Sequence, residues 1–333
     1  SFNELFEQVS LWAHALKKHG IKKGDRVAAL MPNLPETIIA YLATASIGAI
    51  WSSASPDFGI QGIIDRFDQI DPKIFITVDG YSYNGKNIDC LDKIKKVQQS
   101  LKTLEHIFIV NNLAHNCDIS KIKNAKFIDD ILKEHEPANI DFETVSFNHP
   151  LCIMFSSGTT GAPKCIVHGH GGTLLQHIKE HQLQCDIQAN DKVFYFTTCG
   201  WMMWNWLVTA LSSEATLLLY EGNPFYPDGN RLWDFAEKHQ ATLFGTAAKY
   251  IDALNKADIH PNDTHDLNQL RTITSTGSPL VHESFDFVHQ HIKADVHLSS
   301  ISGGTDIVSC FVLGNPISPV FRGEIQGAGL GMA

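Results

Sequence analysis

The sequence predicts an α/β protein whose sheets are mostly parallel and flanked by helices. The first reason is that short apolar runs alternate with helical segments along most of the chain. Strands that alternate with helices of this length form parallel sheets covered on both faces. The second reason is the 44% hydrophobic content of the 333 residues, which is ample for a large core divided into two or three lobes.

The first elements follow from local signals. An amphipathic helix opens the chain, and Gly20 ends it. A short buried strand is predicted at 27–31. Pro35 then begins a helix that extends to about residue 47, and a second strand follows at 49–53. The residues that define the buried face of the first helix are Leu5, Val9, Trp12, Ala13 and Leu16.

The same alternation continues to residue 299. In the first half, strands are predicted at 74–78, 107–110, 151–155 and 165–168, and helices at 88–101 and 173–184. In the second half, strands are predicted at 193–197, 215–220, 242–245, 272–275 and 296–299, and helices at 202–212, 231–239, 248–257 and 281–292. The polar stretch 111–148 has the composition of a surface connector.

The formal net charge of −10 disfavours two classes of partner. An acidic protein is a poor general binder of nucleic acid or of an anionic membrane. No apolar run approaches the ~20 residues needed to span a bilayer, so no membrane insertion is expected. A phosphate ligand would therefore be held by local backbone N–H groups and a few basic side chains. Oligomeric state is not predictable from these features.

The cysteines indicate a reducing compartment. They are odd in number, form no C-x-x-C pair, and several lie in apolar strands. We therefore expect reduced, mostly buried thiols in a cytoplasmic protein. The seven positions are Cys90, Cys117, Cys152, Cys165, Cys185, Cys199 and Cys310.

A loop rich in glycine and hydroxyl side chains follows the predicted strand 151–155. Its candidate ligand-binding residues are Ser156, Ser157, Gly158, Thr159, Thr160, Gly161 and Lys164. Glycines let backbone N–H groups approach an anion, and hydroxyls and a lysine donate to phosphate oxygens. The loop is therefore predicted to bind the phosphates of a nucleotide. The alternative is a flexible surface loop, which the flanking apolar strands disfavour.

This loop departs from the P-loop of kinases and NTPases. The P-loop has four residues between its glycines and then Gly-Lys-Ser/Thr. Here only two residues separate Gly158 from Gly161, Pro163 precedes Lys164, and Cys165 replaces the hydroxyl that would bind magnesium. ATP chemistry of the kinase type is therefore disfavoured.

A second motif suggests a different class of enzyme. His177, Glu180 and His181 match the pattern H-x-x-E-H of some zinc peptidases, with the two histidines on one helical face. No further convincing ligand accompanies them in the sequence. The preferred interpretation is a set of exposed helix residues, and a zinc hydrolase remains the alternative.

The loop from Ser156 to Lys164 resembles the phosphate-loop signature of the acyl-adenylate-forming enzymes, which include acyl-CoA synthetases, luciferases and the adenylation domains of peptide synthetases. The resemblance extends over nearly the whole chain. Its closest branch is the acetyl- and acetoacetyl-CoA synthetases. Stretches 51–59, 200–205 and 302–306 favour the acetoacetyl type. The substrates and cofactors implied are ATP, Mg²⁺, coenzyme A and a short-chain carboxylate.

The resemblance also implies a domain organisation. Residues 25–185 would form one α/β lobe with the phosphate loop, and residues 1–24 with 186–312 would form the second. Residues 313–333 would begin a distorted β-barrel. The small C-terminal domain of the family, with its catalytic lysine, is not recognisable, so the chain is expected to be a piece of a longer protein. Such a piece is expected to catalyse adenylation poorly by itself.

Two further motifs gain a role from the resemblance. Gly277, Ser278 and Pro279 would contact adenine, although a simple turn is the better explanation of the motif taken alone. The run Gly303-Gly304-Thr305-Asp306 resembles a motif in which the threonine contacts the α-phosphate and a carboxylate holds Mg²⁺. Asp306 replaces the usual glutamate, and Ser302 replaces an aromatic residue. Lys164, Thr305 and Asp306 are the implied catalytic residues.

The implied acyl pocket includes Trp201, Phe244 and Gly303. Apolar groups must line a tunnel for an acyl or pantetheine chain. Acetate-specific members carry a tryptophan near position 303, so glycine there would admit a longer acyl group. The implied reaction is acetoacetate + ATP + CoA to acetoacetyl-CoA + AMP + diphosphate. The alternatives are an acetyl- or propionyl-CoA synthetase and a non-catalytic nucleotide-binding fragment.

Overall fold

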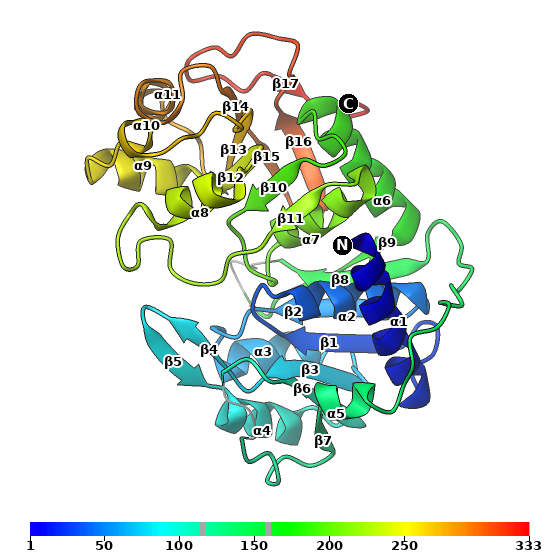
Figure 1. The fold of residues 1–333 in the computed structure, drawn as a ribbon. Coiled ribbons are helices and arrows are strands. Elements are labelled where there is room, and N and C mark those ends of the chain that lie inside the picture. The colour runs from blue at the N-terminus through cyan, green and yellow to red at the C-terminus, as the bar shows by residue number, and fades with distance from the viewer. Residues whose placement is uncertain (114–116, 157–160, 333) are drawn as a thin grey trace. The chain divides into compact units, whose positions relative to one another are not determined.

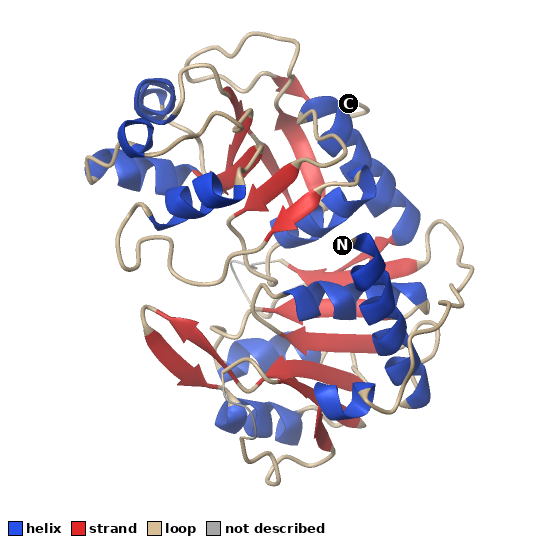
Figure 2. Ribbon diagram, in the orientation of Figure 1, coloured by secondary structure: helices blue, strands red, loops and turns tan. Residues whose placement is uncertain are grey.

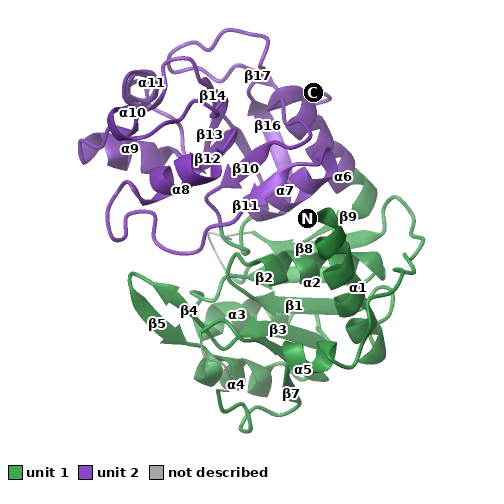
Figure 3. Ribbon diagram, in the orientation of Figure 1, with its two compact units in different colours: residues 1–172, 198–201 green, residues 173–197, 202–333 purple. Residues whose placement is uncertain are grey.

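A computed structural model of the chain describes residues 1–113, 117–156 and 161–332. Sheets flanked by helices make up the described structure, which confirms the predicted α/β class (Figures 1 and 2). The chain divides into two compact units. Unit 1 comprises residues 1–172 and 198–201, and unit 2 comprises residues 173–197 and 202–333 (Figure 3). None of the described helices has the length and apolar character needed to cross a membrane.

Unit 1 is built on a seven-stranded sheet in the order β7-β6-β3-β1-β2-β8-β9. All neighbouring strands are parallel except β8 and β9, which are antiparallel. Its strands are β1 (Arg26–Leu30), β2 (Ile50–Ala54), β3 (Ile74–Val78), β6 (His106–Val110), β7 (Ala125–Phe127), β8 (Pro150–Phe155) and β9 (Cys165–Gly169). Every residue of β3 is buried, as expected for a strand covered on both faces.

The remaining elements of unit 1 cover this sheet or stand beside it. The helices are α1 (Phe2–Lys18), α2 (Pro35–Ser46), α3 (Ile60–Phe67), α4 (Leu91–Ser100) and α5 (Ile128–Leu132). A separate antiparallel hairpin consists of β4 (Gly80–Tyr83) and β5 (Lys86–Asp89). Helix α3 is absent from the predicted elements, because it is short and Gly62 weakens its helical signal. The predicted helix 88–101 begins only at Leu91, because β5 occupies the preceding residues.

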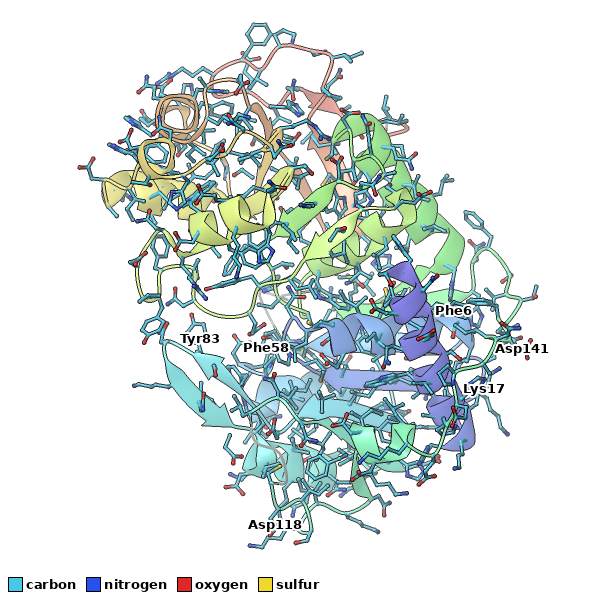
Figure 4. The ribbon with its side chains drawn as sticks, viewed as in Figure 1. Phe6, Lys17, Phe58, Tyr83, Asp118 and Asp141 are labelled. Atoms are coloured by element: carbon cyan, nitrogen blue, oxygen red, sulfur yellow. The ribbon has the colours of Figure 1, made fainter. Side chains whose placement is uncertain are left out.

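Helix α1 belongs to unit 1, whereas the sequence analysis expected residues 1–24 in the second lobe. The helix packs on α2. Ser10 Oγ donates to Ala138 O at 2.5 Å, and Lys17 Nζ donates to Asp141 O at 3.3 Å (Figure 4). The apolar stripe of α1 predicts a buried face but not the lobe that buries it. The boundary between the units also differs from the predicted one at residue 185. Unit 1 ends at residue 172 and includes the separate segment 198–201.

Unit 2 is built on a five-stranded sheet in the order β11-β10-β12-β13-β14, in which all neighbours are parallel. Its strands are β10 (Lys192–Tyr195), β11 (Thr216–Leu218), β12 (Leu243–Ala247), β13 (Thr272–Thr276) and β14 (His297–Ser300). Its helices are α6 (His170–Lys179, shared at its start with unit 1), α7 (Met202–Thr209), α8 (Arg231–His239), α9 (Ala248–Lys256), α10 (Pro261–Thr264) and α11 (His282–Phe287). Single turns of other helix types follow α6, α7 and α11, at Glu180–Gln184, Ala210–Ser213 and Val288–Ile292.

A second, antiparallel sheet completes unit 2. It consists of β15 (Ser302–Gly304), β16 (Ser309–Leu313) and β17 (Gly327–Ala328), in the order β15-β16-β17. The family resemblance predicts that a distorted barrel begins at residue 313. Within the described residues these three strands form an open sheet rather than a closed barrel.

An ion pair joins two strands of the five-stranded sheet at the edge where they begin. Asp191 precedes β10 and Arg271 precedes β13, with β12 between them. Arg271 donates from both terminal nitrogens to Asp191, at 2.9 and 2.7 Å, and the Gln188 N–H donates to the same carboxylate at 2.8 Å. Burial alone would raise the pKa of Asp191. The hydrogen bonds from Arg271 and Gln188 outweigh it and hold the pKa below its usual value.

We expect Asp191→Asn to lower the free energy of unfolding at pH 7 by about 2 kcal/mol, because hydrogen bonds between charged groups are lost. The pKa of Asp191 is lower in the folded than in the unfolded state. The contribution is therefore complete at neutral pH and is lost as pH falls below about 4. Urea unfolding of the natural full-length protein between pH 7 and pH 3.5 measures it. The exposed Asp295→Asn is the control, with a change within about 0.5 kcal/mol. A difference between wild type and Asp191→Asn that does not shrink in acid would contradict this assignment.

Candidate functional site

The predicted phosphate loop connects two antiparallel strands of unit 1. Strands β8 and β9 pair from Pro150↔Gly169 to Phe155↔Cys165, and the loop is the connection between them. The Ser156 N–H donates to Lys164 O at 3.1 Å and closes the base of the loop. Ser157, Gly158, Thr159 and Thr160 lie outside the described residues.

The described end of the loop is anchored and leaves its lysine accessible. Gln69 Nε2 donates to Pro163 O at 2.8 Å, and the thiol of Cys165 lies 3.5 Å from Gln69 Oε1. Gly161 and Lys164 are exposed. Because β9 and not a helix follows the loop, an anion here would depend on the N–H groups and hydroxyls of the loop and on the Lys164 ammonium.

The predicted adenine turn follows β13 in unit 2. Gly277 has φ = +83°, a left-handed conformation in which a side chain is rarely found. A Cβ at this position would meet no atom within 4 Å, so the backbone angle and not a lack of space requires glycine. Gly277 and Pro279 are exposed and Ser278 is half-buried. The turn therefore presents an open backbone surface against which a flat ligand could lie.

The predicted α-phosphate and magnesium residues lie in the turn between β15 and β16. Thr305 and Asp306 follow Gly304 directly. Asp306 is exposed and forms no salt bridge with another described residue. Its carboxylate fits the requirement of Mg²⁺, which prefers one or two protein carboxylates together with phosphate oxygens and waters.

The chain leaves the same edge of the five-stranded sheet after β13, where it enters the turn 277–279, and after β14, where it enters β15. Strands β13 and β14 are parallel neighbours, with Ser275 opposite Ser300. Thr276 Oγ1 donates to Ile301 O at 3.0 Å just beyond that pair. The carboxyl edge of a parallel sheet is where α/β proteins bind nucleotides. The structure therefore brings 277–279 and 301–306 together, while the phosphate loop is part of unit 1.

The structure gives Gly303 a role that differs from the predicted one. A Cβ there would lie 2.0 Å from Ser309 O and 2.6 Å from the Cα of Cys310. Glycine is therefore required by the close approach of β16 at the irregularity in the β15–β16 pairing. The predicted role of the same glycine is to leave space for an acyl group.

The two predicted aromatic pocket residues have contrasting environments. Trp201 is 57% exposed, so its indole is accessible to a ligand. Phe244 is completely buried in the core of unit 2 and stacks on Trp233, with ring centroids 4.4 Å apart and planes 10° apart. Phe244 therefore contributes to the packing of this core, and its place in the acyl pocket stays a prediction.

The H-x-x-E-H segment is buried, not exposed as the sequence analysis expected. His177, Glu180 and His181 have no accessible surface. The His181 ring lies 4.2 Å from that of Trp206, and burial together with His177 lowers its pKa well below the usual value. Among the described residues no group of three or more histidines, cysteines or acidic residues could hold a metal ion. A zinc site on this segment finds no support in the part of the chain that is described.

The chain matches the family described as "AMP-binding enzyme" over residues 1–324. Since this match covers almost all of its 333 residues, the chain belongs to the AMP-binding enzyme family. The resemblance to acyl-adenylate-forming enzymes is thereby confirmed.

Two related sequences and one solved structure that resemble this chain share one name, acetoacetyl-CoA synthetase. The chain is 56% identical to "Acetoacetyl-coenzyme A synthetase" of Rhizobium meliloti (strain 1021) and 50% identical to "Acetoacetyl-CoA synthetase" of Mus musculus. Each alignment covers all of this chain, and 51% and 50% of the relative. The solved structure of "Acetoacetyl-CoA Synthetase from Streptomyces lividans" superposes with a TM-score of 0.94 at 40% identity, over 99% of this chain and 51% of that one. The chain thus spans about half the length of these relatives.

We expect Gly303→Ala to lower the free energy of unfolding by about 2 kcal/mol, because the added methyl group overpacks against the β16 backbone. Gly304→Ala is the matched control. Nothing lies within 4 Å of a Cβ at position 304, so its change should stay within about 0.5 kcal/mol. Urea unfolding of the full-length protein measures both. Equal effects of the two substitutions would show that the contact between β15 and β16 is not what requires glycine.

Proposed function

We propose that the full-length protein is an ATP-dependent acyl-CoA synthetase and that acetoacetate is its carboxylate substrate. The observation that carries the proposal is whole-chain identity of up to 56% with proteins named acetoacetyl-CoA synthetase. Membership of the AMP-binding enzyme family supports the use of ATP. The reaction converts acetoacetate, ATP and coenzyme A into acetoacetyl-CoA, AMP and diphosphate.

In this proposal the nucleotide is held by the motifs described above. The loop that begins at Ser156 and ends at Lys164 binds the β- and γ-phosphates, with the Lys164 ammonium neutralising their charge. The turn 277–279 contacts adenine. Gly303 and Gly304 bring the Thr305 hydroxyl to the α-phosphate. The roles of Ser157, Gly158, Thr159 and Thr160 rest on the family resemblance alone.

Asp306 is proposed to hold Mg²⁺ together with the triphosphate of ATP. The ion would supply positive charge at the phosphate oxygens during displacement of diphosphate. The protein's part is to orient the Asp306 carboxylate and the neighbouring Thr305 hydroxyl in one turn. Catalysis of this kind depends mainly on positioning and on charge neutralisation.

The chemistry has two displacement steps. An acetoacetate carboxylate oxygen attacks the α-phosphorus, and the bond to the bridging oxygen of diphosphate breaks, so that diphosphate leaves with the electron pair. The thiolate of coenzyme A then attacks the carbonyl carbon of the acyl-adenylate, and AMP leaves. The accessible Trp201 is proposed to contact the acyl or pantetheine chain. The seven cysteines are free thiols, which suits a reducing cytoplasm.

ATP–diphosphate exchange by the natural full-length protein tests the proposed function. We expect the highest kcat/KM with acetoacetate and values at least tenfold lower with acetate and propionate. A clear preference for acetate or propionate would instead support the alternative, an acetyl- or propionyl-CoA synthetase. Absence of exchange with all three acids, in a folded protein that binds ATP, would refute the synthetase proposal.

Substitution of the proposed phosphate and metal ligands tests their roles. We expect Lys164→Ala to lower kcat/KM of the exchange about 10²-fold, as is typical when a charge-stabilising group is lost. We expect Asp306→Asn to raise the Mg²⁺ concentration required for half-maximal rate. Lys133→Ala and Asp295→Asn remove exposed charges elsewhere and should leave both quantities within twofold. A wild-type Mg²⁺ dependence in Asp306→Asn would exclude its role as a ligand.

A further inference from the structure

The H-x-x-E-H segment has neither a metal role among the described residues nor a place in the proposed chemistry, yet its two histidines and its glutamate are completely buried. It spans the end of α6 and the turn Glu180–Gln184 in unit 2. The segment lies against β16, the strand that follows the Thr305–Asp306 turn (Figure 1). The contacts of these buried side chains can therefore influence the conformation of the turn that carries Thr305 and Asp306.

Glu180 is a buried carboxylate with four hydrogen-bond donors. Its Oε1 accepts from the Ser309 hydroxyl, from the Cys310 N–H at 3.1 Å and from Gln176 Nε2 at 3.0 Å. Its Oε2 accepts from Trp206 Nε1 at 2.9 Å. A buried carboxylate is costly unless such donors satisfy it, and it fixes the geometry of the groups that do. Two of the four donors belong to the first two residues of β16.

His177 contacts Val308, the residue that precedes Ser309 and Cys310. Its Nε2 lies 2.5 Å from Val308 O, and its Nδ1 lies 3.0 Å from Thr209 Oγ1. A carbonyl oxygen can only accept, so Nε2 carries the proton and donates to Val308. His177 and Glu180, three residues apart on one helical face, thus grip the Val308 carbonyl, the Ser309 hydroxyl and the Cys310 N–H in succession.

Val308 has a backbone conformation that needs such support. Its φ is +49°, in the left-handed region, where a β-branched residue is an outlier. Residues in strained conformations persist only when their surroundings hold them there. Val308 closes the turn, since its N–H donates to Thr305 O at 3.3 Å. Relaxation of Val308 would change the direction in which the turn carries Thr305 and Asp306.

We propose that Glu180 and His177 are positioning residues that clamp Val308, Ser309 and Cys310 and thereby fix Thr305 and Asp306 for adenylation. This inference rests on the proposed function, because it assigns the purpose of the clamp to the reaction at that turn. Displacement of a catalytic group by about 1 Å can lower a rate about 10²-fold. The clamp therefore acts on kcat and on Mg²⁺ dependence without touching substrate.

The main test is Glu180→Gln in the natural full-length protein. The amide keeps the size of the side chain but replaces one acceptor oxygen with an NH₂ group, which would face a donor. We expect kcat of ATP–diphosphate exchange with acetoacetate to fall at least tenfold and the Mg²⁺ dependence to shift to higher concentration. Ser309→Ala removes one clamp contact and should lower kcat three- to tenfold. It keeps the proposal testable if Glu180→Gln fails to fold.

Asp191→Asn is the matched control for these variants. It also alters a buried carboxylate of unit 2 that has several donors, but at the opposite edge of the five-stranded sheet. We expect it to destabilise the fold while kcat and Mg²⁺ dependence stay within twofold, measured well below the unfolding temperature. An equal loss of kcat in Asp191→Asn would show that general destabilisation explains the effect and would overturn the proposal.

The rate of backbone hydrogen exchange in peptides covering residues 302–313 tests the clamp without any substrate. We expect faster exchange there in Glu180→Gln and Ser309→Ala, and unchanged exchange in Asp191→Asn. Unchanged exchange in the two clamp variants would overturn the inference whatever the substrate is. Unchanged kcat in a folded Glu180→Gln would overturn it as well. Failure of the wild-type protein to catalyse exchange would instead count against the proposed function.

Discussion

The pairing of β13 with β14 as parallel neighbours is the constraint on which the candidate site of unit 2 depends. Parallel strands end at a common edge, so the chain must leave both of them there. Gly277 turns the chain after one strand, and Ile301 leads into β15 after the other. The hydrogen bond from Thr276 Oγ1 to Ile301 O ties these exits together. Sequence positions about 25 residues apart thereby become adjacent, which no local turn could achieve.

The antiparallel sheet flanks the turn that carries Thr305 and Asp306 with strands β15 and β16. Strand β16 returns so close to β15 that position 303 has room only for hydrogen, and Glu180, in the turn after α6, accepts hydrogen bonds from Ser309 and Cys310 of the same strand. The turn that carries Thr305 and Asp306 thus has a close backbone contact before it, at Gly303, and hydrogen bonds to a buried carboxylate after it, at Ser309 and Cys310. Such residues can look unrelated to chemistry while deciding where the chemical groups lie.

How much of this could be predicted from the sequence depends on the range of the interactions. Apolar periodicity predicted two mostly parallel sheets, because strand and helix signals are local. The motifs at 156–164, 277–279 and 303–306 were found through glycine, hydroxyl and charged residues at fixed spacing. The unit to which α1 belongs and the burial of His177 differ from the predictions, and the core packing of Phe244 was not predicted. These features depend on which distant element packs against the helix or strand. The apolar pattern of a segment shows that one face is buried but not what buries it.

The strand order of unit 1 has a consequence for biosynthesis. Strand β2 pairs with β1 early in the sequence, but its other neighbour, β8, comes roughly 95 residues later, after Ala54 and before Pro150. At about 5–20 residues per second, the nascent chain exposes an unpaired strand edge for about 5–20 s. Pairing this distant in sequence also slows folding. Strand β8 leads directly into Ser156, where the loop that ends at Lys164 begins, so this end of the sheet can form only after the distant pairing of β2 with β8.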